Sequence, residues 1–551
     1  MKQILYLLLG CLIPFQFLTA KMYSSPERTP VDYVNPYIGN ISHLLVPTYP
    51  TVHLPNSMLR VYPERENFTG NTINGLPLIV TSHRGSSAFN LSPYQGELQK
   101  AGSIIQYGYD NEVIKPYYYS VDLDDDGMYV QYAPSHQSGI YQIDFSQTDK
   151  PAYLIFNTRD GELKTDGKSI SGYQKLGNHT QVYIYLETDQ QPLKIGTHQG
   201  AVIRTTDKST QGHNAYYILE YPKGTASVLL RYGVSFISSE QAKQNLRREI
   251  KNYNLQAVAD KGRSVWNETL GKIFVKGGTE NEKTVFYTSL YRTYERMICI
   301  SEDSRYFSAY DGQVHDDEGI PFYVDDWIWD TYRATHPLRL IIETEMESNM
   351  VNSLIRMAYQ MQPNWMPTFP EINGDSRRMN CNHGVATVLD AYNKGMRSFD
   401  LAKAYQVCKA AITEKTLAPW SSKPAGVLDQ FYKDHGYFPA LAVGEQETVP
   451  EVHSWERRQP AAVTLGTVYD EWCLGNIAQA LGDKKEADYF LKRSLNYHKI
   501  FNKETCFFHP KDSFGNFIQP FDYRYSSGVG GRDAYDENNG WVYRWDLPHN
   551  V

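Results

Sequence analysis

Acidic and aromatic side chains gather in two segments of this sequence. In residues 323–338, three aspartates and two tryptophans fall within six positions, and Asp330 directly follows Trp329. In residues 533–545, Glu537 precedes two further tryptophans. Hydrolysis of a glycosidic bond needs one protonated and one ionised carboxyl group, and flat aromatic rings cover the faces of sugars well. The two segments therefore indicate chemistry on carbohydrates.

Both acids also have a purely structural interpretation. Asp330 precedes an expected helix, where it would act as the cap and pair with Arg333. A glutamate just before a helix is commonly a first-turn charge, which is the alternative for Glu537. Against that alternative, Trp541 and Trp545 would surround Glu537 with apolar surface, raise its pKa and keep it protonated as an acid.

Two other segments carry candidate residues. In residues 379–392, His383 is a candidate contact for a substrate, whereas Asp390 falls within an expected helix and is expected to tie loops together. Asp470 and Glu471 open another expected helix, where a hydrogen-bonding role and a pocket role fit equally well. The sequence has no phosphate-binding glycine loop, no HExxH helix and no Ser/His/Asp signature that would suggest another chemistry.

Length and composition narrow the class of protein. The chain has 551 residues, which predicts two or three domains because one core seldom organises so many. It holds 43 tyrosines against 22 phenylalanines, a bias that suits sugar binding and is also common in β-sheet proteins. The net charge of −8 argues against nucleic acid as a partner. The cysteines show neither zinc-site spacing nor a disulfide framework.

Residues 1–20 predict a signal peptide. Lys2 precedes an apolar run over residues 4–18, and small and polar residues follow, so cleavage is expected near Ala20. The run is too short to span a bilayer, and no later segment is long and apolar enough to do so. Processing as a lipoprotein at Cys11 ranks lower, because it would leave a very short apolar region. We expect an exported protein, secreted or periplasmic.

The pattern of apolar residues divides the rest of the chain. Over residues 21–238 apolar and polar residues alternate, as in 139–145 and 181–186, which predicts an antiparallel β-sandwich. Residues 239–279 predict a helical linker with Ser239 as its N-cap. Residues 280–551 have helical periodicity throughout and predict an (α/α)6-type toroid. The clearest expected helices cover residues 285–297, 338–361, 384–395, 402–412, 466–481 and 484–501.

Several short motifs then follow one another in a fixed order. They lie at residues 34–39, 329–338, 390–400, 472–478 and 537–550. The last begins Glu537-Asn538-Asn539-Gly540-Trp541-Val542-Tyr543, which is similar to the usual Glu-Gly-Asn-Ala-Trp-Gln-Tyr acid motif of glycoside hydrolase family 92. Together these motifs cover nearly the whole mature chain, which resembles that family from end to end.

The resemblance implies an exo-acting, inverting, calcium-dependent α-mannosidase that acts on mannose-containing glycans. It would consist of a β-sandwich followed by an (α/α)6 barrel. By motif, Glu537 matches the general acid, while Trp329 and Asp330 match the wall around the terminal mannose. His83, on the sandwich side, is implied to reach the same pocket. Asn538 replaces the usual glycine after the acid, so the local geometry is expected to differ.

The family pattern also places its calcium loop and catalytic base after the acid motif. This sequence has 14 residues after Glu537, and about seven or eight expected helices where a closed ring needs about twelve. We therefore expect a toroid incomplete at its C-terminus, calcium ligands outside this chain, and impaired activity. The alternatives are a non-catalytic mannose-binding remnant and another α/α-toroid enzyme such as a phosphorylase or lyase. Calcium dependence and release of free mannose would separate the family interpretation from the phosphorylase.

Overall fold

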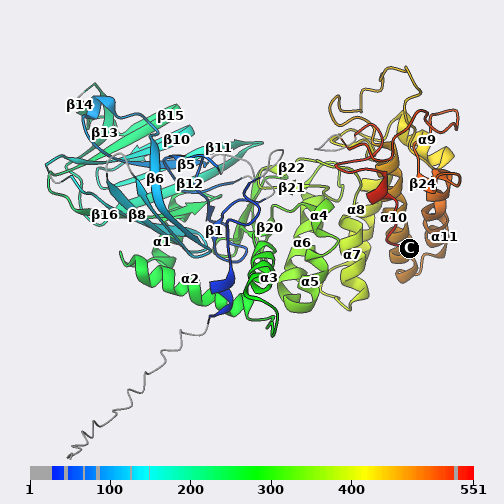
Figure 1. The fold of residues 1–551 in the computed structure, drawn as a ribbon, viewed down its shortest axis with the longest axis horizontal. Helices are drawn as coiled ribbons and strands as arrows, with labels where there is room; N and C mark the ends of the chain where they lie inside the picture. The colour runs from blue at the N-terminus through cyan, green and yellow to red at the C-terminus, as the bar shows by residue number, and fades with distance from the viewer. Residues whose placement is uncertain are drawn as a thin grey trace, which may run out of the picture.

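A computed structural model describes residues 28–41, 48–65, 69–81, 87–123, 127–147, 149–200, 202–526 and 532–550. The predicted signal peptide, the alternative lipid site Cys11 and the candidate pocket residue His83 lie outside these residues. In the described part, an antiparallel β-sandwich occupies one end of the molecule and a row of helices occupies the other (Figure 1). The predicted fold class, β followed by α, is confirmed.

The sandwich is built from fourteen connected strands. The long strand β10 joins its layers, because its first half pairs with β5 and β15 while its second half pairs with β11 and β15. The strands are β3 (Thr72–Asn74), β4 (Leu76–Pro77), β5 (Phe89–Gln95), β6 (Gln106–Lys115), β7 (Tyr118–Leu123), β8 (Met128–Pro134), β9 (Ser138–Asp144), β10 (Ala152–Thr165), β11 (Ser169–Gly177), β12 (Thr180–Thr188), β13 (Lys194–Gln199), β14 (Val202–Arg204), β15 (Ser209–Tyr221) and β16 (Ser227–Ser235).

The alternation of buried and half-exposed side chains along the strands explains why they form a sandwich. In β12, Val182, Ile184 and Leu186 are buried while their neighbours are half-exposed, because successive side chains of a strand point to opposite faces. Short two-stranded sheets outside the sandwich shape the loops: β1 (Val52–His53) with β2 (Arg60–Val61), β17 (Ile298–Cys299) with β20 (Tyr323–Val324), β18 (Arg305–Ser308) with β19 (Gln313–Asp316), β21 (Pro370–Glu371) with β22 (Gly374–Asp375), and β23 (Phe501–Asn502) with β24 (Phe507–Phe508).

Two helices lie beneath the sandwich, α1 (Ser239–Glu249) and α2 (Leu255–Leu270) (Figure 1). The sequence suggested one continuous helical stretch capped by Ser239, and both details are wrong. Ser238 is the N-cap, since its side chain accepts a hydrogen bond from the Gln241 backbone N–H at 3.0 Å. Asn254 caps α2 in the same way, so the chain restarts a helix there instead of continuing α1.

The remaining helices differ from the expected ranges in several places, for example at α3, which covers Glu280–Arg292 where residues 285–297 were expected. The expected helix 338–361 is two helices, because Glu343 adopts a non-helical backbone and its carboxylate binds Lys272 and Tyr294. Residues 427–435 form a helix that the sequence analysis missed, and the expected helix 484–501 turns into a 3-10 helix after Arg493. The helices are α3 (Glu280–Arg292), α4 (Ile328–Thr331), α5 (Thr335–Ile342), α6 (Thr344–Gln360), α7 (Gly384–Asn393), α8 (Leu401–Thr413), α9 (Val427–His435), α10 (Pro460–Ala480), α11 (Lys484–Arg493) and α12 (Gly540–Tyr543).

Neighbouring helices pack as pairs. α5 contacts α6, α7 contacts α8, and α10 contacts α8 and α11, so the helices stand side by side (Figure 1). One hydrophobic core continues from sandwich residues such as Tyr141 into helical residues such as Leu354 and Val388. This shared core fixes the sandwich against the helices. None of the helices in the described residues is long and apolar enough to cross a membrane.

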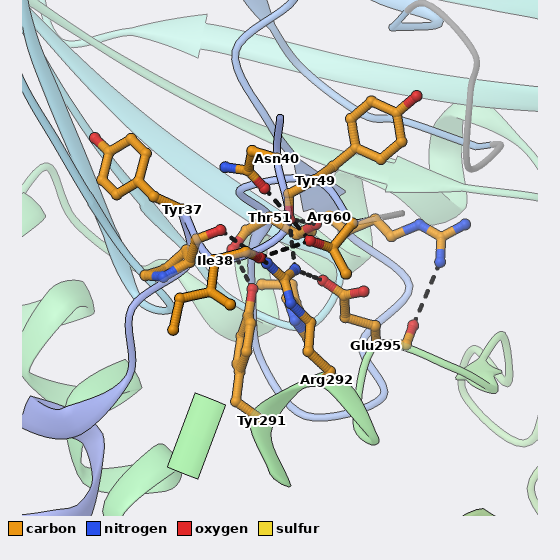
Figure 2. Close-up of polar contacts among 12 residues, drawn as sticks. Tyr37, Ile38, Asn40, Tyr49, Thr51, Arg60, Tyr291, Arg292 and Glu295 are labelled. Carbon is orange, nitrogen blue, oxygen red and sulfur yellow. Dashed lines mark hydrogen bonds and ion pairs between the residues drawn. The ribbon is translucent and has the colours of Figure 1, made fainter. Parts of the chain in front are cut away.

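Arg292, at the end of α3, anchors the segment that precedes the sandwich. Its guanidinium donates to the carbonyl oxygens of Pro36 at 2.7 Å and Tyr49 at 2.5 Å, and to Glu295 at 2.7 Å (Figure 2). Burial alone would raise the pKa of Glu295, but the charge of Arg292 together with those of His53 and Arg296 outweighs burial, and the pKa is lowered. Tyr291 also donates to the Thr51 carbonyl at 2.5 Å. The Arg292 guanidinium therefore donates hydrogen bonds to several backbone carbonyl oxygens and to one carboxylate.

We predict that Arg292→Met lowers the free energy of unfolding by about 3 kcal/mol or more, because it leaves Glu295 partly buried without its partner. Urea denaturation measures this loss. The matched control is Arg28→Met, because Arg28 and Glu280 form an exposed pair that should contribute at most ~1 kcal/mol. Equal, small effects of both substitutions would contradict the anchoring role.

Candidate active site

Two adjacent buried aspartates hold the loop that carries Trp329 and Asp330. The first, Asp325, adopts a left-handed backbone with φ 69° and accepts hydrogen bonds from Arg60 and Arg296, both at 2.5 Å. Arg60 lies on β2 and is 265 residues away in sequence. This double ion pair ties the loop to the N-terminal part of the chain.

The second aspartate, Asp326, belongs to a buried three-residue network. His336 contacts Asp326 through Nε2 at 2.8 Å and Glu347 through Nδ1 at 2.7 Å. Burial alone would lower the pKa of His336, but the charges of Glu347 and Asp326 outweigh burial and raise it to about 10. His336 is therefore an imidazolium cation at neutral pH. It fixes the loop to both α5, which carries His336, and α6, which carries Glu347.

Aromatic packing completes the support of this loop. The Arg296 guanidinium lies 4.0 Å from the centre of the Trp327 ring, which stacks on Phe369 at 5.8 Å. The Asp326 backbone N–H donates to the Pro370 carbonyl at 2.8 Å. These contacts hold the turn between β20 and α4, so the half-buried Trp329 and the following Asp330 are presented from a fixed base.

Asp330 is open to solvent, and its carboxylate makes no hydrogen bond to the residues that the structure describes. The surrounding protein nevertheless limits its solvation, which raises its pKa, and the charge of Glu537 raises it further, to about 7. The structural alternative for Asp330 is wrong. Ala334 is the N-cap of α5, and Arg333 pairs with Asp546 at 2.5 Å. The carboxylate is left available for a ligand.

Glu537 lies on an exposed turn just before α12. It adopts a left-handed backbone with φ 49°, and Asn539, not Glu537, caps α12. The first-turn interpretation is therefore wrong. The expected apolar surroundings are also wrong, because Trp541 is 52% exposed and Trp545 is 72% exposed. The charge of Glu537 acts on two other carboxyl groups, those of Asp330 and Asp536.

Asp536 is one of those groups. It is 1% exposed, and its Oδ2 accepts a hydrogen bond from Asn380 at 3.2 Å. Burial, followed by the charges of Glu537 and Glu456, raises its pKa to about 8. Asp330, Asp536 and Glu537 therefore cannot all ionise at low cost, and the cluster retains protons near neutral pH. A retained proton beside an open turn is what a general acid requires.

The other predicted residues are engaged by neighbouring side chains or backbone groups. His383 is 6% exposed, contacts Asp470 through Nδ1 at 2.7 Å, and lies 4.2 Å from the Tyr332 ring. Asp470 is fully buried and also accepts from the Asn382 backbone N–H, which favours its hydrogen-bonding role. Asp390 is wrong as a loop tie, since its carboxylate pairs with Lys394 on the same helix.

The residues that fix these groups could not be identified from the sequence. Asp325 and Asp326 stand out only as part of an acidic cluster, and no motif assigns a role to His336, Asn380 or Gln459. Asn380 donates to Gln459 at 2.8 Å as well as to Asp536, and Gln459 donates to Glu456. Two adjacent acids beside aromatic residues were the available signal, but their partners are distant in sequence.

The described residues offer no grouping of three or more His, Cys, Asp or Glu side chains suited to a metal ion. A calcium site built from these residues alone therefore does not fit the observed geometry. Calcium binding therefore stays an expectation of the family resemblance.

Sequence comparison places the chain among known proteins. It matches the family model of the glycosyl hydrolase family 92 N-terminal domain over residues 33–235 and that of the family 92 catalytic domain over residues 241–551. An uncharacterized secreted glycosidase of Arthroderma benhamiae is 23% identical, and the match covers 94% of this chain and 68% of that protein.

Solved structures agree with the sequence match. An inverting family 92 mannosidase from Bacteroides thetaiotaomicron superposes with a TM-score of 0.82 at 25% identity, over 95% of this chain and 71% of that one. A second family 92 α-mannosidase from the same organism, in complex with mannoimidazole, gives a TM-score of 0.81 at 21% identity with the same coverage. The second likeness supports the fold alone.

We predict that His336→Gln lowers the free energy of unfolding by about 3–5 kcal/mol near neutral pH, because Asp326 and Glu347 lose their shared cation. The folded-state pKa of about 10 exceeds the usual 6.5, so this stabilisation is complete below about pH 6.5 and is lost as pH rises through 10. Urea denaturation across this range tests both points. His213→Gln, at an exposed position on β15, is the control, and an unchanged pH dependence in His336→Gln would contradict the assignment.

A second prediction concerns Asp330. Its folded-state pKa of about 7 exceeds the usual 3.8, so the folded protein loses stability as pH rises between these values. Asp330→Asn should therefore raise the melting temperature at pH 8 and leave it nearly unchanged at pH 4. The control is Asp488→Asn on the exposed side of α11. A melting temperature that is unchanged at both pH values would show that ionisation of Asp330 does not destabilise the folded protein.

Proposed function

The chain belongs to glycosyl hydrolase family 92, and from this premise we propose that it is an exo-acting α-mannosidase that removes terminal mannose from glycans with inversion. Both the sequence match and the similar structure of an inverting family 92 mannosidase support a glycoside hydrolase. The observation that carries the proposal is the electrostatic proximity of Asp330 and Glu537, which come from segments about 200 residues apart in sequence.

The two acids have different roles in this proposal. Glu537 is the general acid, because it lies on an exposed turn where a glycosidic oxygen can approach, and its charge acts on both Asp330 and Asp536. Asp330 accepts hydrogen bonds from mannose hydroxyls, and Trp329 forms a wall beside it. Proton donation to the leaving oxygen typically contributes about 10²–10⁴-fold to the rate.

An inverting enzyme also needs a carboxylate about 6.5–9.5 Å from the acid, with room for one water. Asp536 is buried and has a raised pKa, and Asp470 is engaged by His383 and Asn382, so neither is suited to activate water. Calcium dependence stays a prediction of the family resemblance. The roles proposed for Glu537 and Asp330 do not depend on a bound metal.

Product analysis tests the proposed reaction. The purified protein is incubated with a high-mannose oligosaccharide, with and without calcium, and followed by proton NMR. We expect slow release of free mannose, which appears first as the β-anomer and needs no phosphate, because neither Asp536 nor Asp470 is suited to activate water. Mannose 1-phosphate formed only with phosphate would indicate a phosphorylase instead. Binding of the oligosaccharide without any release would indicate a carbohydrate-binding protein.

The role of the acid gives a sharper prediction. Glu537→Gln should lower kcat/KM about 10²–10⁴-fold for an oligosaccharide but far less for an aryl mannoside with an acidic phenol, since that leaving group needs no proton. Steady-state kinetics on both substrates measure the contrast. Glu504→Gln, an exposed glutamate outside the cluster, is the control. Equal losses on the two substrates would show that Glu537 is not the proton donor.

We also propose that the protein is exported and cleaved near Ala20, because residues 1–20 have the three regions of a signal peptide. The secreted glycosidase of Arthroderma benhamiae is consistent with export. Intact-mass measurement of exported protein is expected to give an N-terminus close to Lys21. A lipid-bearing N-terminus at Cys11 would contradict this route.

A further inference from the structure

A chain of hydrogen-bonded side chains connects the start of α10 to the turn that carries the proposed acid. Arg532 Nε and Gln459 Nε2 both donate to Glu456 Oε2, at 2.9 and 2.8 Å. Asn380 Nδ2 donates to Gln459 Oε1 at 2.8 Å and to Asp536 Oδ2 at 3.2 Å. The four residues other than Arg532 are at most 4% exposed, so solvent has little access to these hydrogen bonds.

The ion pair at one end sets the direction of every bond in this chain. Because Glu456 is paired with Arg532, its oxygen acts as an acceptor, and Gln459 must turn its NH₂ group toward it. The Gln459 carbonyl oxygen then faces Asn380, which must present its own NH₂ group in turn. One amide hydrogen of Asn380 goes to Gln459 and the other goes to Asp536. Asn380 is therefore held as a donor to the carboxyl group that directly precedes the acid.

Left-handed backbone conformations gather along this chain. Met379 and Cys381, on either side of Asn380, have φ 67° and 70°. Gln459 has φ 48°, and Glu537 itself has φ 49°. Residues with a Cβ atom seldom adopt this conformation, and it persists where the surrounding structure enforces it, most often at functional sites. Unfavourable backbone geometry on both sides of one buried hydrogen bond indicates that this bond holds the site in shape.

Hydrogen bonds to the backbone hold the turn on either side, but they do not reach the Asp536 side chain. An N–H of α10 donates to the Ala534 carbonyl at 3.0 Å, and the Tyr543 hydroxyl donates to the backbone carbonyl of Asp536 at 3.0 Å. Among the described residues, Asp536 Oδ1 has no hydrogen-bond partner, so Oδ2 and its bond from Asn380 orient the side chain. We propose that Asn380 is a positioning residue for proton donation: through Asp536 it holds the turn that presents Glu537 to the glycosidic oxygen. The inference rests on the proposed function.

Kinetics with two different leaving groups test this role. Asn380→Leu removes the donor at similar size, so the turn is no longer held through Asp536. kcat/KM for a high-mannose oligosaccharide should fall about 10-fold to 100-fold, since displacing a reacting group by about 1 Å has effects of this size. The fall should lie mainly in kcat, with KM little changed. An aryl mannoside with an acidic phenol needs no proton, so its kcat/KM should change much less.

Asn245→Leu is the matched control. Asn245 is also buried, and its Nδ2 donates to the Val234 carbonyl at 2.9 Å and to Glu302 at 2.7 Å. It lies on α1, beneath the sandwich (Figure 1). This substitution should lower the melting temperature as Asn380→Leu does, but it should not distinguish between the two substrates. Asn380→Ala, which removes the donor without adding an apolar group, replaces Asn380→Leu if circular dichroism shows that the latter does not fold.

Glu537→Gln, measured on the same substrates, separates failure of this inference from failure of the proposed function. In that background Asn380→Leu should cause no further loss, because the proton donor is already absent. If Glu537→Gln lowers kcat/KM equally for both substrates, Glu537 is not the acid, and Asn380 has no donor to position. If Glu537→Gln distinguishes the substrates but Asn380→Leu affects both equally or neither, the proposed function stands and the positioning role is wrong.

Discussion

The site depends on the neutralisation of two adjacent buried carboxylates, Asp325 and Asp326. Neighbouring residues that both carry buried negative charge are costly unless each has its own cation. Here Asp325 is paired with Arg60 and Arg296, whereas Asp326 is paired with the His336 imidazolium. The cations come from different parts of the fold, so the loop cannot move without breaking several buried ion pairs. This constraint gives Trp329 and Asp330 a defined position.

At Asp330 and Asp536, by contrast, a neighbouring carboxyl group, that of Glu537, opposes ionisation. Burial, followed by the charge of Glu537, raises the pKa values of Asp330 and Asp536 to about 7 and about 8. The ion-paired carboxylates Asp325 and Asp326 therefore fix the shape of the site, whereas Asp330 and Asp536 retain protons near neutral pH. In glycosidases, environments that keep one carboxyl group neutral and leave another ionised divide the role of general acid from that of base or nucleophile.

The sequence was sufficient for features that depend on local periodicity. Alternation in residues 181–186 predicted β12 and its sandwich, because one face of a strand must be buried. The sequence was not sufficient for features that depend on contacts between residues far apart in the chain. The break at Glu343 depends on Lys272 and Tyr294, and the exposure of Trp541 could not be predicted from its spacing to Glu537. The short helix α9 was missed although Gly436, with φ 80°, ends it in the manner typical of helix C-termini.

The central claim is that Asp330 and Glu537 act on the same sugar, and a double-mutant cycle tests it most directly. kcat/KM for a high-mannose oligosaccharide is measured for the parent protein, Asp330→Asn, Glu537→Gln and the double variant. If the two groups share one substrate and influence each other's charge, their effects should be non-additive by about 0.5–3 kcal/mol. Effects that add within about 0.3–0.5 kcal/mol would mean that the two residues act independently, which would contradict a common site.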